Sequence, residues 1–284
     1  MTTKQVEPVD LFANQQRPTW CPGCGNFAIW TTLKKALARV GWQPHQVVIV
    51  FGIGCAGNGA NDLRAYTIHG LHGRALPLAT GIAAANPRLH VVVVGGDGDG
   101  YGEGLAHFIQ TARINPNITY LVHDNQVFSL TKGQASPTSQ PGMTTDTTPG
   151  GVVDIPLSPL ALALAANASW IGRGFSGEID QLESLMIDAL NHRGFSYLDI
   201  FQPCVTFNHL NTFQWFYERV KKIASKDQDL TDRQVAWRLI NQPDLLPIGL
   251  FYRQPRPILE EQYPFAAAST PHNRELQSFY QGWQ

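Results

Sequence analysis

Two neighbouring segments decide the fold: His90–Gly104, which reads HVVVVGGDGDGYGEG, and Ile118–Asn125, which reads ITYLVHDN. HVVVV and ITYLV are short, mostly apolar runs, which are typical of parallel strands buried on both faces. The residues between them, Leu105–Asn115, have helical spacing and end before Pro116. The pattern therefore predicts a strand–helix–strand unit in which both strands end at the same edge of a sheet.

Polar residues follow each of these two strands. Asp97 lies in the GDGD sequence after the first strand, and Asn125 follows the second. A carboxylate and an amide oxygen at one sheet edge can share a hard cation that also binds diphosphate oxygens. The surrounding glycines allow a diphosphate to approach backbone N–H groups. Two unrelated Asx turns at the strand ends would explain each residue singly but not the pair.

The rest of the chain continues the alternation of strands and helices. Further strands are predicted at Val47–Phe51, Ser169–Ile171 and Tyr197–Phe201. Helices are predicted at Phe27–Val40, Arg74–Asn86, Leu160–Ala168, Ile179–His192, Thr212–Ile223 and Asp232–Asn241. This order predicts an α/β fold, with a mostly parallel sheet and helices on both faces. We expect an N-terminal arm over residues 1–20, a cofactor-binding domain over 21–210, and C-terminal helices with an extended arm over 211–284.

Composition excludes several classes of protein. The 284 residues carry a net charge of −1, which argues against a nucleic-acid binder that relies on bulk phosphate attraction. Charged residues make up 15%, against roughly 25% on average, and this favours buried contact with a partner chain. The first twenty residues contain no apolar signal region. The most apolar stretch, residues 155–172, is broken by prolines and polar residues, so no membrane span is expected and we predict a cytoplasmic protein.

The four cysteines form a candidate metal site. Cys21 and Cys24 belong to a Cys-Pro-Gly-Cys turn, whereas Cys55 and Cys204 each follow a predicted strand. Strand ends on one edge of a parallel sheet could meet the turn. Four soft ligands suit zinc or an iron–sulfur cluster, and the spacing does not choose between them. Buried small hydrophobic residues are the alternative interpretation.

A glycine motif in the same region is misleading. Gly52–Gly57 matches the GxGxxG pattern of dinucleotide-binding proteins. That function requires an acidic residue about 20 positions further on, to hold the ribose. No Asp or Glu occurs between Asp62 and Asp97. We therefore predict that these glycines let the backbone come close to a group other than a dinucleotide.

Taken together, the motifs resemble those of a known family. They are CPGCG (21–25), GIGCAG (52–57), HGRALPLATG (72–81), GGDGDG (95–100), DNQ (124–126), LTKGQASPT (130–138) and QPC (202–204). This combination is similar to the β subunit of 2-oxoacid:ferredoxin oxidoreductases, and most similar to the 2-oxoglutarate (2-oxoglutarate synthase) branch. The resemblance covers residues 18–210 and is highly specific.

The resemblance implies a thiamine-diphosphate-binding fold and a set of ligands. It implies that Mg²⁺ is held by Asp97, Asn125 and the backbone carbonyl of Val127. It implies a 4Fe–4S cluster on the four cysteines. The residues implied to contact thiamine diphosphate are Ile53, Gly54, Cys55, Ala56, His72, Gly73, Arg74, Ala75, Gly98, Asp99, Ser129 and Leu130.

The resemblance also implies the reaction. Thiamine diphosphate is the electron sink as a 2-oxoacid loses CO₂, the cluster passes electrons one at a time to ferredoxin, and coenzyme A takes the acyl group. The reverse reaction fixes CO₂, and the sequence does not set the direction. The activating glutamate is implied to come from a partner α subunit in an α₂β₂ assembly, so we assign no general base in this chain. Because Cys55 lies in the loop implied to contact the cofactor, the cluster is expected close to it.

The substrate is less defined by the sequence. Related sequences often carry Lys or Arg where this chain has Asn58, so a second substrate carboxylate would need Arg74, Lys132 or the α subunit. Arg74 could equally serve the diphosphate or a structural ion pair, and Lys132 could be a solvated loop residue. The segment Tyr101–Ala106 also departs from relatives, and we expect His107 to be a structural helix residue.

Three hypotheses follow. The first is the catalytic β subunit acting on 2-oxoglutarate, with pyruvate or another 2-oxoacid as the alternative substrate. The second is a zinc-stabilised non-catalytic partner subunit, which would be colourless. The third is a non-oxidative thiamine enzyme such as a decarboxylase, which would need no cluster and no electron acceptor.

Overall fold

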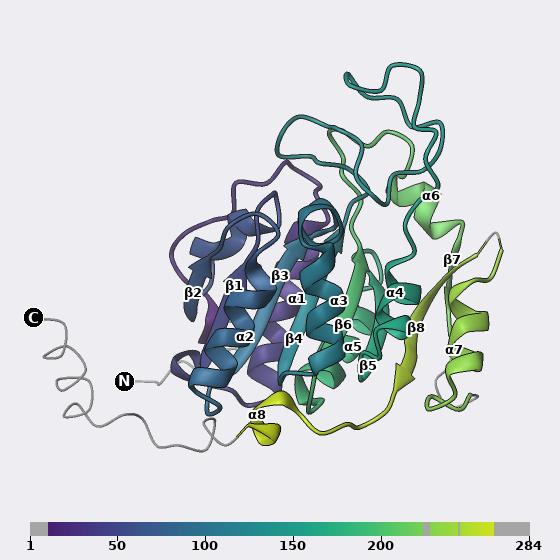
Figure 1. Ribbon diagram of the computed structural model, residues 1–284. Coiled ribbons are helices and arrows are strands. Elements are labelled where there is room, and N and C mark those ends of the chain that lie inside the picture. Colours follow the sequence, from purple (N-terminus) through teal and green to yellow (C-terminus); the bar gives the residue numbers. More distant parts are fainter. Residues whose placement is uncertain (1–10, 224–227, 244, 264–284) are drawn as a thin grey trace, which may run out of the picture.

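The computed structural model describes residues 11–223, 228–243 and 245–263, which form an eight-stranded sheet between two layers of helices (Figure 1). The sheet order is β2-β1-β3-β4-β6-β5-β8-β7. The strands are β1 (Val47–Phe51), β2 (Tyr66–His69), β3 (His90–Gly96), β4 (Ile118–Asp124), β5 (Trp170–Phe175), β6 (Ser196–Phe201), β7 (Val220–Lys222) and β8 (Leu246–Arg253). The α-helices are α1 (Asn26–Arg39), α2 (Ala75–Ala85), α3 (Leu105–Ile114), α4 (Pro159–Ala165), α5 (Ile179–Asn191), α6 (Phe213–Tyr217), α7 (Arg233–Ile240) and α8 (Leu259–Gln262). The other helical segments are η2 (Pro44–Gln46), η3 (Gly57–Asn61) and η4 (Gly98–Glu103).

The apolar strand runs supply both faces of the sheet. In β3, Val91 and Val93 belong to one core cluster with α2, α3 and α4, whereas Val92 and Val94 belong to a second with α1 and α5. Successive side chains on a strand point to opposite faces. A strand covered on both faces is therefore apolar at successive positions, as Val91–Val94 are, and the polar His90 at the start of the strand is only half-buried. The predicted α/β fold with helices on both faces is confirmed.

The strand register determines which residues gather at the carboxyl edge of the sheet. All neighbouring pairs from β2 to β5 in the sheet order run parallel. Gly96 of β3 lies opposite His123 of β4, and Asp124 lies opposite Phe201 of β6. One step beyond these pairs, Asp97 is level with Asp124, and Asn125 is level with Gln202, so all three side chains follow strand ends at one edge of the sheet. The segment between β4 and α4, drawn in teal at the top of Figure 1, stands over this edge.

Most of the predicted elements agree with the structure to within a few residues, but the C-terminal part differs. The helix predicted at Thr212–Ile223 is wrong: it is a short helix, α6, followed by the strand β7. The hydroxyl oxygen of Thr212 accepts a hydrogen bond from the Trp215 N–H and begins α6. Val220 then pairs with Leu246, a long-range contact that local spacing does not reveal.

Besides β7, two further strands were not predicted. β8 pairs antiparallel with β5 and so extends the sheet, and β2 forms the opposite edge. The strand predicted at Ser169–Ile171 begins one residue later and continues to Phe175. Of the predicted N-terminal arm, residues 1–10 lie outside the described residues, and Phe12 and Trp20 are buried. Residues 264–284 of the predicted C-terminal arm also lie outside the described residues. The division of the chain at residue 210 stays a prediction.

Candidate active site

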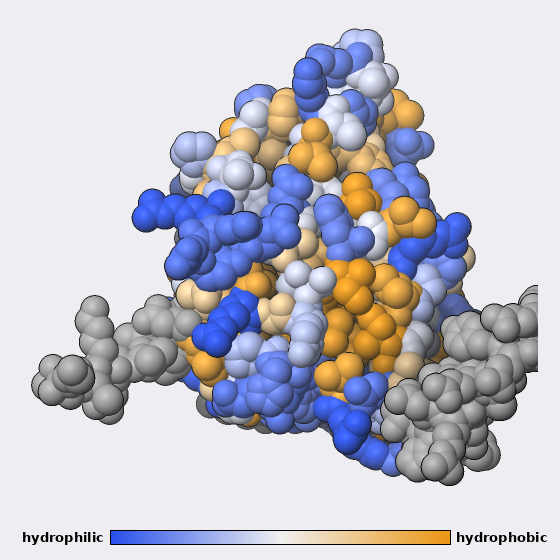
Figure 2. Space-filling model, turned by 90° about the vertical axis from the view of Figure 1, so that its left-hand side faces the viewer, coloured by the Kyte–Doolittle hydropathy of each residue, from blue (hydrophilic) through white to orange (hydrophobic). Residues whose placement is uncertain are grey.

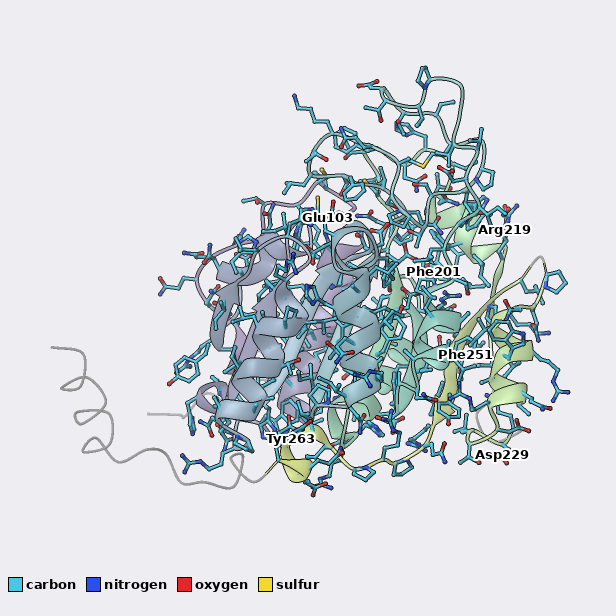
Figure 3. The ribbon with its side chains drawn as sticks, viewed as in Figure 1. Glu103, Phe201, Arg219, Asp229, Phe251 and Tyr263 are labelled. Atoms are coloured by element: carbon cyan, nitrogen blue, oxygen red, sulfur yellow. The ribbon has the colours of Figure 1, made fainter. Side chains whose placement is uncertain are left out.

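Two adjoining cavities open at the carboxyl edge of the sheet. The glycine cavity is lined by Ile53, Gly54, Cys55, Ala56, His72, Gly96, Asp97, Gly98, Asp99, His123, Asn125, Val127, Phe128, Ser129, Leu130 and Thr131. The cysteine cavity is lined by Thr19, Trp20, Cys21, Cys24, Asn26, Cys55, Asn58, Asn125, Ser129, Leu130, Gln202, Cys204, Val205, Thr206 and Phe207. Cys55, Asn125, Ser129 and Leu130 line both, so these four residues form a shared wall. Figure 3 shows Glu103, the last residue of η4, at the same upper edge.

Asp97 and Asn125 both line the glycine cavity, as predicted for a cation site. Asn125 Oδ1 accepts a hydrogen bond from the Val127 N–H at 3.1 Å, which leaves one of its two lone pairs free. Asp97 Oδ2 accepts from the Thr138 hydroxyl at 2.8 Å. Burial raises the pKa of Asp97 to about 6, against hydrogen bonds that favour the carboxylate. A buried carboxylate beside a free amide lone pair is a donor set that suits Mg²⁺.

The glycines fit a ligand that approaches the backbone closely. A Cβ built on Gly54 meets nothing within 4 Å, and on Gly96 it meets only His123 O at 4.0 Å. Both residues line the glycine cavity. The missing side chains therefore leave open space along the backbone, which is the arrangement a diphosphate needs.

Asp99 joins the loops that surround the glycine cavity. Its Oδ1 accepts hydrogen bonds from the N–H groups of Ile53 at 3.0 Å and Gly73 at 2.8 Å. A Cβ on Gly52 would lie 2.0 Å from Asp99 Oδ2. The first glycine of the GxGxxG motif thus leaves room for the Asp99 carboxylate of this chain. Asp99 was expected to contact the cofactor; it lines the cavity, but its carboxylate also holds the 52–54 and 72–74 loops in place.

All four cysteines line the cysteine cavity, and none forms a disulfide. Burial raises the pKa of the Cys24 thiol to about 11, and the other three cysteines raise it further. Such thiols ionise when a metal coordinates them. The four thiols are part of the lining of a cavity of about 180 Å³, whereas four sulfurs at roughly 2.3 Å from one zinc ion would leave no open space between them. The donor set and the space fit an iron–sulfur cluster better than a single ion.

Within the described residues, no group of three or more His, Cys, Asp or Glu side chains is arranged to hold a single metal ion.

Three residues that the sequence did not single out line the cavities. Gln202 donates to Cys24 Sγ at 3.3 Å. The Nδ1 atom of His123 forms a hydrogen bond with Asn26, and its Nε2 atom has no partner among the described residues. Burial lowers the pKa of His123 to about 3. The His-Asp-Asn-Gln order at the end of β4 and the QPC sequence are the signals that could have indicated them.

The predicted substrate residues are not brought together. Asn58 lines the cysteine cavity, but Arg74 and Lys132 are exposed and belong to neither lining. Arg74 instead forms a short contact with His107. Gly73 and Ala75, predicted cofactor contacts, are also absent from the lining, whereas His72 is part of it.

Comparison with known proteins decides the family. Residues 52–200 match the thiamine pyrophosphate enzyme C-terminal TPP-binding domain, and residues 204–268 match the C-terminal region of the pyruvate ferredoxin oxidoreductase β subunit. The 2-oxoacid:ferredoxin oxidoreductase subunit beta of Saccharolobus solfataricus is 38% identical over 82% of this chain and 81% of its own length. This chain belongs to the 2-oxoacid:ferredoxin oxidoreductase β subunits.

Two further relatives of this β subunit carry more specific names. The 2-oxoglutarate oxidoreductase subunit KorB of Mycobacterium tuberculosis is 40% identical over 73% of this chain, which spans 56% of that protein. A 2-oxoglutarate:ferredoxin oxidoreductase from Magnetococcus marinus, solved with 2-oxoglutarate, coenzyme A and succinyl-CoA bound, superposes with a TM-score of 0.89. It is 35% identical, and the match covers 98% of this chain and 97% of that chain.

Proposed function

We propose that this β subunit, together with an α subunit, oxidatively decarboxylates 2-oxoglutarate to succinyl-CoA and CO₂, or runs the reverse CO₂-fixing reaction. In this proposal, electrons pass through a 4Fe–4S cluster to ferredoxin. One observation carries the proposal: the glycine cavity and the cysteine cavity share a wall, which includes the thiol of Cys55. A cluster bound in the cysteine cavity would lie close enough to a cofactor in the glycine cavity to receive electrons from the decarboxylation reaction.

The residues of the glycine cavity would hold Mg²⁺ and thiamine diphosphate. Asp97, Asn125 and the Val127 carbonyl would bind the cation, and the open backbone at Gly54 and Gly96 would receive the diphosphate. Thiamine diphosphate, when bound, supplies the electron sink for loss of CO₂ from a 2-oxoacid. Cys55, Ser129 and the half-exposed Leu130 line both cavities, and they would lie beside the reacting end of the cofactor.

The choice of 2-oxoglutarate rests on relatives and not on a cation found in the site. The M. tuberculosis relative and the M. marinus structure both carry 2-oxoglutarate in their names. Neither cavity lining includes a Lys or Arg among the described residues. We therefore propose that the α subunit supplies the cation for the second substrate carboxylate. Pyruvate or another 2-oxoacid remains the alternative substrate.

An apolar surface beside the glycine cavity supports a partner subunit. Tyr66, Ile68, Leu71 and Leu78 expose between 38% and 77% of their surface. They belong to β2, α2 and the loop between them, and this loop continues into His72 of the cavity lining. Figure 2 shows apolar residues gathered on this side of the molecule. Exposed apolar patches of this kind mark protein interfaces, so we propose that the α subunit covers the glycine cavity from here.

The proposal also includes a location. No helix among the described residues is long and apolar enough to cross a membrane. Thiols that must stay reduced to bind iron suit the cytoplasm, and we propose that compartment for an α₂β₂ enzyme.

The test is a substrate panel on the co-purified αβ complex under anaerobic conditions. Viologen dye would be the electron acceptor, with 2-oxoglutarate, pyruvate and coenzyme A added in turn. We expect a brown protein that reduces the dye with 2-oxoglutarate and coenzyme A. The Asp97→Asn variant should remain brown but lose turnover, because it removes a proposed Mg²⁺ ligand and no thiol.

Each alternative predicts a different result. Activity with pyruvate alone would overturn the substrate assignment. A colourless zinc-containing complex would indicate the non-catalytic partner subunit, and CO₂ release without any acceptor would indicate a non-oxidative decarboxylase. Full activity of this chain by itself would overturn the need for the α subunit.

A further inference from the structure

A chain of hydrogen bonds crosses the shared wall from the glycine cavity to two of the thiols. Asn125 Nδ2 donates to Ser129 Oγ at 3.2 Å and to Gln202 Oε1 at 3.3 Å. The Ser129 hydroxyl donates to Cys55 Sγ at 3.0 Å, and Gln202 Nε2 donates to Cys24 Sγ at 3.3 Å. Asn125, Ser129 and Gln202 are all at least 92% buried, so water does not compete for these donors.

Backbone groups fix the direction of this chain at both ends. The Val127 N–H can only donate, so the Asn125 atom that faces it at 3.1 Å must be the amide oxygen. The Asn125 NH₂ group must then face Ser129 and Gln202. At the other end, the Pro203 carbonyl can only accept, so the Gln202 atom at 3.0 Å from it must be nitrogen. Both assignments agree, and an amide flip at either residue would place like groups together.

We propose that Ser129 and Gln202 are positioning residues that donate hydrogen bonds to the cluster thiolates, raise the reduction potential of the cluster, and link it to the proposed Mg²⁺ ligand Asn125. This inference rests on the proposed function, because it requires that the cysteines hold a cluster. Hydrogen bonds to cluster sulfurs are one of the means by which proteins set these potentials. An added electron makes the sulfurs more negative, so a fixed donor stabilises the reduced cluster more than the oxidised one.

The same chain couples the two cavities. The Asn125 oxygen that would bind Mg²⁺ belongs to the same amide whose NH₂ group faces Ser129 and Gln202. A cation on that oxygen polarises the amide and strengthens its N–H donors, and hydrogen-bonded chains transmit such polarisation. The cluster potential should therefore be higher with Mg²⁺ and thiamine diphosphate bound than after their removal.

The test is a redox titration of the αβ complex, followed by electron paramagnetic resonance of the reduced cluster, with iron counted in each preparation. The variants are Ser129→Ala and Gln202→Met, each of which removes one donor to a sulfur. We expect each to lower the midpoint potential by an amount equivalent to about a tenfold change in the one-electron equilibrium constant, or roughly 59 mV. Ser129→Thr keeps the hydroxyl and should restore the wild-type potential.

Ser176→Ala is the matched control. Its hydroxyl is also buried and lies near Gln202, since a Cβ on Gly25 would meet Ser176 Oγ at 2.7 Å and Gln202 Cγ at 2.9 Å. That hydroxyl has no hydrogen-bond partner among the described residues. Its removal should leave the potential unchanged, which separates loss of a donor to sulfur from loss of any buried hydroxyl.

The outcomes distinguish this inference from the proposed function. Wild-type protein without a cluster would overturn the proposed function. Fully loaded variants with the wild-type potential would overturn the inference and leave the function intact. If a variant does not retain iron, the wild-type potential is measured with Mg²⁺ and thiamine diphosphate present and after their removal. Equal values would overturn the link through Asn125, and a higher loaded value would support it.

Discussion

Replacement of Gly98 by alanine should weaken cofactor binding without removing any ligand. A Cβ at Gly98 would lie 2.3 Å from Cε1 of Phe128, with two more ring atoms within 2.8 Å. The ring must retreat by about 1 Å to reach an ordinary 3.4 Å contact. Phe128 lines the glycine cavity. The ring can therefore turn into an empty cavity, but not into one that holds thiamine diphosphate.

The cost should consequently appear in binding more than in folding. Overpacking of this kind costs about 1–3 kcal/mol, which corresponds to a dissociation constant that is roughly 5- to 150-fold larger. We would measure the affinity of the αβ complex for thiamine diphosphate at saturating Mg²⁺ by calorimetry, and its thermal midpoint without cofactor. The midpoint should change little, while the affinity falls within that range.

Two variants make the reasoning refutable. Gly102→Ala lies in the same segment, η4, but its Cβ would meet Phe128 Cζ at 3.4 Å and Pro137 Cγ at 3.8 Å, so we expect normal affinity. The double variant Gly98→Ala/Phe128→Leu removes the ring atoms that clash and should recover most of the loss. If Gly98→Ala binds as well as Gly102→Ala, or if the leucine gives no recovery, the steric account is wrong.

Three further predictions concern charge and ligands. Because burial raises the pKa of Asp97 to about 6, protons should compete with Mg²⁺ below that pH, as measured by calorimetry. The metal-free protein should lose stability in thermal melts as pH rises from 4 to 7, and Asp97→Asn should reduce this loss, while the raised pKa of Asp124 keeps part of it. Arg173→Met should lower the unfolding free energy by about 3–5 kcal/mol in urea titrations, since the buried Asp199 loses its cationic partner at 2.8 Å and keeps only the Tyr101 hydroxyl. Arg193→Ala, in an exposed ion pair, should not change the unfolding free energy measurably. Cys204→Ser should lower the iron content and the absorbance near 400 nm, and unchanged iron would contradict its role as a ligand.

The sequence predicts the parts of the fold in which local pattern and burial agree. HVVVV and ITYLV are mostly apolar because both faces of these strands are covered, and the two strands end at the same edge of the sheet, as predicted. β8 was missed because its partner β5 lies some 75 residues away along the chain and pairs with it antiparallel. In 212–223, one apolar pattern fits both a long helix and the observed short helix with a strand.

For the candidate site, too, the sequence predicts only part of what the structure shows. Residue types and strand ends predicted that Asp97 and Asn125 would meet, and the family resemblance implied that Cys55 would lie near the cofactor. They did not predict the directions of side chains. Gln202 was read only as part of the QPC motif, yet it bonds Asn125 and Cys24. Lys132 was a substrate candidate by charge, but its backbone φ of 79° places it in an exposed turn outside both linings.

The buried carboxylates at this edge of the sheet favour the proposed cation site. The Thr138 hydroxyl lies 2.8 Å from both Asp97 Oδ2 and Asp124 Oδ1, but a hydroxyl has one proton to donate. Burial and the neighbouring carboxylates, Asp199 first among them, raise the pKa of Asp124 well above its usual value. The Thr138 hydroxyl can therefore satisfy only one of the two carboxylates at a time. A divalent cation on Asp97, as proposed, would take the place of that donor and leave the Thr138 hydroxyl to donate to Asp124. We therefore expect binding of the proposed cation to stabilise the folded chain, with a rise in the thermal midpoint on addition of Mg²⁺ as the measurement.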